Sequence, residues 1–177
     1  RMFAFEHDEV IPDIVVLGKA LGGGILPIAA VLAHNDLDVC GDFAIGHYTH
    51  EKNPVTARAA LTTIQIIEDE GLVERSAMLG THALNRLREF ASNSPFVGDV
   101  RGRGLMIGVE MVENRTTKKE ALNLAERVYY RCLEAGLSFK VSAGCVLTLS
   151  PPLTISMHDL DRAIGIVEVA ITAETRQ

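Results

Sequence analysis

The order of apolar and polar positions near the start of the chain predicts two short strands. Residues 13–17 and 28–33 are apolar, partly β-branched runs of the length that buried strands have. The loop between them contains three consecutive glycines at residues 22–24. Two buried strands joined in this way fit the interior of an α/β sheet, and a plain hairpin with a flexible tip is the simpler alternative.

Two helices are expected next. Asn53 followed by Pro54 is typical of a helix start, with Asn as the capping residue and Pro in the first turn, and the pattern continues to about Asp69. Gly71 interrupts it. Apolar residues then recur every three or four positions as far as about Phe90, which predicts a second helix.

Beyond a turn at residues 92–95 the pattern changes to strands mixed with helices. The expected strands are residues 104–111, 138–141 and 146–149, and the expected helices begin at a capping box formed by Thr117 and Glu120 and at Ser156. Elements in this order predict a compact α+β module. We place the boundary between the two parts of the chain at residues 75–95.

The composition of the chain mainly excludes certain classes of function. The chain has 177 residues, 47% of them hydrophobic, and a formal net charge of −6. No apolar run approaches the ~20 residues of a membrane span, and an acidic chain without a Lys/Arg block argues against a nucleic-acid partner. Three scattered cysteines predict neither disulfides nor a metal site, which favours a reduced, cytoplasmic setting. Because the chain starts at Arg1 rather than Met, we expect a fragment.

Lys19 is the first candidate for chemistry. It follows the first predicted strand directly and precedes the glycines at residues 22–24. A lysine in so apolar a stretch is expected to be desolvated, and burial lowers the pKa of an amine, which can then attack an aldehyde to form a Schiff base. The glycines would let a planar cofactor approach the backbone. A solvated lysine at a strand end is the alternative that the spacing leaves open.

Two polar segments are weaker candidates. Residues 47–50 (HYTH) precede the helix start at Asn53 and could bind an anion, because helix N-termini favour negative charge. A polar surface loop is the simpler interpretation. Arg101 and Arg103 alternate with glycines and could clamp a carboxylate or phosphate. A tight turn entering a strand, with both arginines solvated, is the favoured interpretation.

The segment RMFAFEHDEVIPDIVVLGKALGGGILPIAAVLA (1–33) resembles the segment around the cofactor lysine of class III, pyridoxal-phosphate-dependent aminotransferases. GDVRGRGLMIGVEMV (98–112) and LTLSPPLTIS (147–156) resemble the small C-terminal domain of that family. The resemblance implies an α/β fold, the C-terminal portion of a fold-type I enzyme. Residues 1–75 would be the C-terminal part of the large three-layer α/β, PLP-binding domain. Residues 76–177 would be a connecting helix and the small α+β domain.

The resemblance also implies roles. Lys19 would be the catalytic residue, holding pyridoxal 5'-phosphate (PLP) as a Schiff base and moving a proton between the substrate carbon and the cofactor. Thr49 would bind the cofactor phosphate of the neighbouring subunit, which implies a homodimer or homotetramer. The reaction would transfer an amino group between an amine or amino acid and an oxo acid.

Three departures from the family bear on the reaction. Thr148 stands where many relatives have an arginine for the substrate carboxylate, so Thr148 is a candidate substrate-binding residue. The segment from Thr49 to Pro54 (THEKNP) is closer to the dialkylglycine decarboxylase and amino-lactam racemase branch than to typical aminotransferases. The family's pyridine-binding aspartate and phosphate cup lie upstream of Arg1. Decarboxylation, elimination and racemisation therefore stay open, as does a non-catalytic scaffold.

Overall fold

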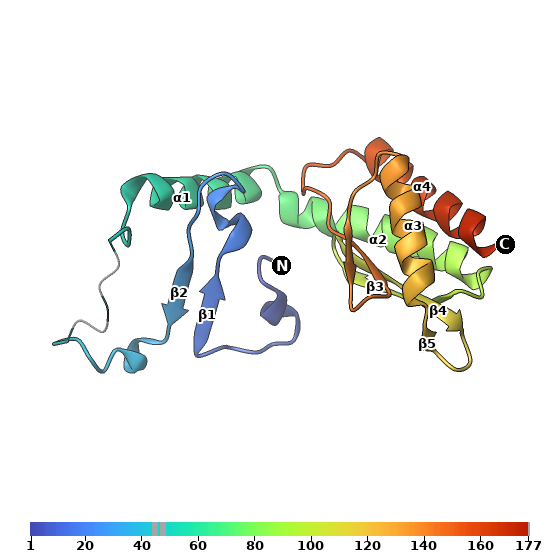
Figure 1. Cartoon of the computed structure of the whole chain (residues 1–177). Coiled ribbons are helices and arrows are strands. Elements are labelled where there is room, and N and C mark those ends of the chain that lie inside the picture. The colour runs from blue at the N-terminus through green and yellow to red at the C-terminus, as the bar shows by residue number, and fades with distance from the viewer. Residues whose placement is uncertain (44–45, 47–48, 177) are drawn as a thin grey trace. The chain divides into compact units, whose positions relative to one another are not determined.

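The computed structural model of the chain describes residues 1–43, 46 and 49–176. These residues form two compact units, Arg1–Val73 and Glu74–Gln177. The elements of both are labelled in Figure 1.

The first unit is built on an antiparallel pair of strands. β1 (Ile14–Leu17) pairs with β2 (Ala30–Ala33), so that Ile14 lies opposite Ala33. Both strands occur where the apolar runs predicted them. The expectation that they are buried is wrong for this structure, because Ile14 and Val16 are 55% and 72% exposed. A two-stranded sheet with one long helix encloses too little volume for a core.

Three short 3₁₀ helices and the long helix α1 complete this unit. The short helices are η1 (Ala4–His7), η2 (Lys19–Gly22) and η3 (Asn35–Leu37), and α1 spans Pro54–Asp69. α1 begins at the predicted residue, since Asn53 Oδ1 accepts hydrogen bonds from the backbone N–H of Val55 at 2.9 Å and of Thr56 at 3.4 Å. η2 packs against α1. The next helix, α2, spans Leu72–Ser92 and begins after Gly71, as predicted.

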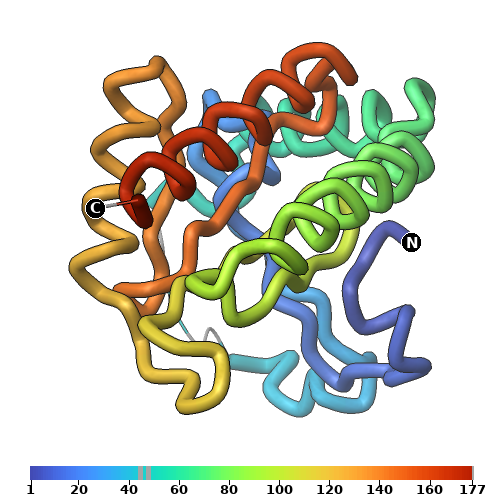
Figure 2. Tube along the Cα trace, turned by 90° about the vertical axis from the view of Figure 1, so that its right-hand side faces the viewer, coloured from blue at the N-terminus to red at the C-terminus, as the bar shows by residue number. Residues whose placement is uncertain are grey.

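The second unit contains an antiparallel sheet in the order β3-β4-β7-β6, with β5 paired to β4. The strands are β3 (Val97–Arg103), β4 (Met106–Asn114), β5 (Lys119–Glu120), β6 (Lys140–Ser142) and β7 (Val146–Leu149). The helices packed with this sheet, besides α2, are α3 (Leu122–Glu134) and α4 (Met157–Thr175). α3 and α4 lie side by side (Figures 1 and 2).

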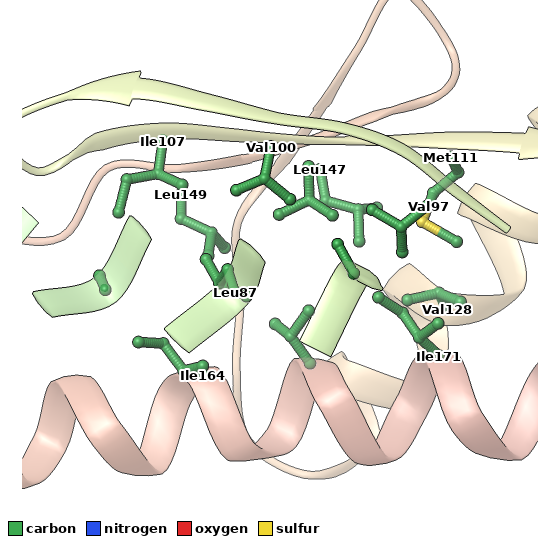
Figure 3. Close-up of a cluster of buried hydrophobic side chains, with 14 of the residues drawn as sticks. Leu87, Val97, Val100, Ile107, Met111, Val128, Leu147, Leu149, Ile164 and Ile171 are labelled. Atoms are coloured by element: carbon green, nitrogen blue, oxygen red, sulfur yellow. The ribbon is translucent and has the colours of Figure 1, made fainter. Parts of the chain in front are cut away.

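The core lies between one face of this sheet and the helices. Figure 3 shows side chains from the strands pointing toward Ile164 and Ile171 of α4. The apolar face of α3 is buried, and Ala125, Val128 and Cys132 each have no exposed surface. Since side chains alternate between the faces of a strand, the intervening residues lie on the opposite face of the sheet, away from this core.

β3 was not predicted from the sequence. Arg101 and Arg103 lie within this strand rather than in a tight turn, and the turn comes at Gly104, whose φ is +55°. The strand contains a register shift between Val97 and Asp99, and a Cβ at Gly98 would lie 2.6 Å from Val112 Cγ1. Glycine and charged residues are poor strand formers, so the local sequence does not predict β3. The strand forms because it pairs with β4.

The capping box expected at Thr117 and Glu120 is also wrong. The N-terminal capping residue of α3 is Ala121, and the two residues before it form β5, which pairs with β4. Asn114 Oδ1 accepts hydrogen bonds from the N–H groups of Thr116 at 2.7 Å and Thr117 at 3.1 Å. This turn returns the chain to the sheet, so a strand forms where the local pattern favoured a helix start.

Candidate active site

Lys19 is the first residue of η2, and one residue, Gly18, separates it from the end of β1. Its φ is +54°, in the left-handed region, which costs a residue with a side chain about 1–2 kcal/mol. The preceding Gly18 is extended, and Gly23 after η2 is again left-handed with a φ of +72°. Non-glycine residues persist in this region where the surrounding fold imposes it, and such residues are concentrated at functional sites. Glu9, Lys52, Lys118 and Ala143 share this conformation. Lys19 is therefore distinguished by the conformation together with its place between β1 and the glycines at residues 22–24.

The side chain of Lys19 is exposed. The expectation of a desolvated amine is therefore wrong for this structure, and burial supplies no activation of the amine here. The reason is the same as for β1, since the two-stranded sheet buries few side chains. What the structure does provide is an amine at a fixed backbone position with free access.

The glycines after Lys19 fit closely onto α1. A Cβ at Gly23 would lie 3.2 Å from Thr63 Oγ1, whose hydroxyl donates to the carbonyl of Ala59 at 2.9 Å. A side chain at Gly23 would also be strained at this positive φ. Residue 23 must therefore be a glycine because η2 approaches α1 closely there. This close approach fixes the turn that carries Lys19.

Thr49 lies in an exposed turn before α1, in the same unit as Lys19. His50 is likewise exposed, whereas His47 and Tyr48 lie outside the described residues. The first N–H groups of α1 are already engaged by Asn53, so the helix start offers an anion fewer free donors than the sequence suggested. The hydroxyl of Thr49 remains accessible for a ligand.

Thr148 lies on β7 in the second unit, half-buried. Its hydroxyl donates to Ser142 Oγ on the neighbouring strand at 2.9 Å. Lys140 is its direct partner across the β6–β7 pair. Ser142 and Lys140 could not be predicted as neighbours of Thr148, although both strands were expected, because the apolar pattern does not specify which residues face each other.

Arg101 is solvated, as favoured from the sequence, but it is not free. Its Nη1 donates to Asp99 Oδ2 at 2.9 Å and to Glu110 Oε2 at 2.6 Å. The hydrogen bond that Arg101 donates to Asp99, followed by the one that it donates to Glu110, raises the pKa of Arg101. This guanidinium is therefore compensated by two carboxylates rather than offered to an anion.

The sequence predicted neither a metal site nor a membrane-spanning segment. Within the described ranges, no group of three or more His, Cys, Asp and Glu side chains could hold a metal ion. None of the described helices is both long and apolar enough to cross a bilayer. His82 is partly exposed and pairs with Asp161 at 2.7 Å between Nε2 and Oδ1.

Comparison with known families assigns the chain. The family model for class III aminotransferases matches residues 1–171. The chain belongs to the class III aminotransferase family. This family depends on PLP, and the expected α/β fold of a fold-type I enzyme is confirmed by a solved transaminase from the marine bacterium Virgibacillus. That structure has a TM-score of 0.93 at 29% sequence identity, and the match covers 100% of this chain and 42% of that one.

Two curated members of the family are similar in sequence but differ in reaction. The chain is 43% identical to an (R)-1-hydroxy-2-aminoethylphosphonate ammonia-lyase of Vibrio splendidus, over 96% of this chain and 35% of that protein. It is 42% identical to a leucine/methionine racemase of Thermococcus litoralis, over 97% of this chain and 38% of that protein. The chain therefore spans well under half the length of the relatives it matches.

Proposed function

We propose that this class III chain is part of a PLP-dependent enzyme that transfers an amino group between an amine or amino acid and an oxo acid. The observation that carries the proposal is Lys19, a lysine held at a left-handed backbone position between a strand and glycines. Lys52 and Lys118 are also left-handed, with φ of +58° and +53°, but neither lies between a strand and glycines, so the proposal rests on the combination found at Lys19.

Lys19 and Thr49 are the residues of this chain that fit the cofactor. Lys19 offers an exposed primary amine that can hold PLP covalently, and the exposed hydroxyl of Thr49 can donate a hydrogen bond to a phosphate oxygen. When bound, PLP supplies the electron sink on which amino-group chemistry depends. Lys19 would then take a proton from the substrate carbon and return it at another position.

The same assignment gives the two parts of the chain their roles. We propose that residues 1–75 belong to the PLP-binding domain and residues 76–177 are the connecting helix and small domain. The first unit exposes apolar side chains such as Val16, Ile25 and Val31, at 72%, 86% and 67%. Surfaces of this kind are covered in assemblies, which supports the homodimer or homotetramer expected from the sequence. The three free thiols are compatible with the expected cytoplasmic setting.

A second candidate is ammonia elimination or racemisation on the same scaffold. It is favoured by the two similar proteins named for those reactions and by Thr148, which lacks the fork that clamps a carboxylate. Both reactions also begin with removal of a proton by a lysine such as Lys19. Product analysis separates the candidates, because transfer requires an oxo acid as acceptor whereas elimination releases ammonia without one.

The direct test is reductive trapping. The chain is incubated with PLP, reduced with borohydride and digested, and the labelled lysine is identified by mass. We expect labelling of Lys19 alone, its loss in Lys19→Arg, and no change in the matched variant Lys118→Arg. Diffuse labelling of several lysines, or none, would overturn the assignment and leave this chain as a scaffold.

A further inference from the structure

A groove with a volume of about 580 Å³ lies between α3 and β6 in the second unit. Ligand pockets have volumes of about 300–1,000 Å³, so this groove is large enough for a small organic molecule. Its walls include Leu122, Glu126, Tyr129 and Tyr130 of α3 and Phe139, which directly precedes β6. All the residues that line it belong to the second unit, so the groove is formed by this unit alone.

Three of these side chains are aromatic, and Tyr129 contacts the other two. Its ring centroid lies 5.4 Å from that of Tyr130, with 62° between the ring planes. It lies 5.5 Å from the ring centroid of Phe139, with 82° between the planes. Such edge-to-face contacts hold the rings at steep angles to one another. Because the face of an aromatic ring is electron-rich, rings at steep angles can surround a single cation from more than one side.

Glu126 adds an uncompensated carboxylate to the groove. It precedes Tyr130 by four residues on α3, so the two side chains lie on the same face of the helix. Glu126 is exposed and forms no ion pair with any residue that the structure describes. By contrast, Glu174 of α4 is paired with Arg127 and Arg131 of the same helix α3. The free carboxylate therefore belongs to the groove that also contains the rings.

Lys140 also borders the groove, but its ammonium points away from it. The residues on either side of it, Phe139 and Val141, pack against the core that α3 covers. Since side chains alternate between the two faces of a strand, Lys140 projects to the opposite face of the sheet. Its backbone thus contributes to the wall, and the charge offered inside the groove is the negative one of Glu126.

We propose that this groove binds a quaternary ammonium group, carried either by a free small molecule or by a methylated lysine side chain. Such a group combines a positive charge with an apolar surface, and aromatic faces together with a carboxylate match both properties. A primary ammonium would instead need acceptors for three N–H donors, which rings and an aliphatic wall do not provide. No residue proposed to hold the cofactor takes part, so this binding is independent of the proposed function.

The test is titration of the whole chain with choline chloride at constant total salt, followed by the amide chemical shifts of α3 and β6. The comparison ligand is neohexyl alcohol, the uncharged isostere of choline in which carbon replaces the nitrogen. We expect choline to bind about threefold more tightly or better, because only the cation gains from the ring faces and from Glu126. A parallel titration with N-acetyl-trimethyllysine amide distinguishes the two sources. Tighter binding of this amide assigns a methylated lysine, and tighter binding of choline assigns a small molecule; both support the site.

Variants identify the groups that bind the cation. Glu126→Gln and Tyr130→Leu should each weaken choline binding about threefold to fivefold. Tyr130 is 54% exposed, so its replacement leaves the core intact. Glu134→Gln is the matched control, because it removes the same charge from another exposed glutamate of α3 that does not line the groove. We expect this control to leave choline affinity unchanged.

Three results would overturn the proposal. Equal affinity for choline and neohexyl alcohol would indicate an apolar groove without preference for a cation. Unchanged choline affinity in both Glu126→Gln and Tyr130→Leu, with the variants shown to be folded by circular dichroism, would place any binding elsewhere. Equal weakening by Glu134→Gln and Glu126→Gln would indicate general attraction of cations to an acidic surface.

Discussion

Replacing Gly80 in α2 by alanine is expected to change stability in the direction opposite to the one that helix propensity alone would give. Replacing a glycine in a helix interior by alanine normally stabilises by about 1 kcal/mol. Here a Cβ at residue 80 would lie 2.1 Å from the carbonyl oxygen of Gly104 and 2.3 Å from its carbonyl carbon. The helix thus contacts the β3–β4 turn backbone to backbone. We expect Gly80→Ala to destabilise the second unit.

The size of this destabilisation follows from how far α2 and the β3–β4 turn must separate. Ordinary contact begins at 3.4 Å, so α2 and the turn must separate by more than an ångström. The turn cannot yield freely, because the N–H of Leu105 donates to Ser76 Oγ of α2 at 3.2 Å. Separation would also loosen Leu79 and Leu87, each 1% exposed against the sheet. Taking about 3 kcal/mol for overpacking and subtracting about 1 kcal/mol for propensity leaves a net loss of about 2 kcal/mol.

The assay is urea unfolding followed by far-UV circular dichroism. Gly165→Ala in α4 is the matched control, because the added Cβ would lie 3.4 Å from Arg86 Nη2, the end of a flexible side chain. That variant should gain about 0.5–1 kcal/mol from helix propensity. If Gly80→Ala unfolds at the same or a higher urea concentration than the unmodified chain, the inferred backbone contact between α2 and the turn is wrong.

Three further outcomes are expected. Asn53→Ala should cost about 1 kcal/mol by removing the acceptor at the start of α1, seen as faster amide exchange there, whereas Asn53→Asp should be nearly neutral. Hydrogen bonds from Arg131 and a second arginine of α3 lower the pKa of Glu174 below 4.5. Glu174→Gln should therefore lose about 1–2 kcal/mol near neutral pH, and the difference should fade as pH falls below 4.5 through the lowered pKa; an undiminished difference in acid would contradict this. Burial raises the pKa of Cys132 to about 11, so thiol reagents should modify partly exposed Cys40 first, and equal rates in the folded chain would refute this.

The helices could be predicted because their signals are local. Asn53 caps α1 with its own side chain, and Ser156 Oγ accepts a hydrogen bond from the N–H of Asp159 at 3.0 Å at the start of α4. Both interactions join residues two or three positions apart, so a single sequence contains all the information that they need. The buried stripes follow from the same short period.

Non-local pairing explains what could not be predicted. β3 and β5 are strands because each pairs with β4, although glycine, charge and a capping-box pattern favoured other structures there. The burial expected at Lys19 depends on which segments cover β1, a property that no local run encodes. The candidate site shows the same limit, since Thr148 was identified by its place in a motif, whereas Lys140 and Ser142 emerged only from strand register.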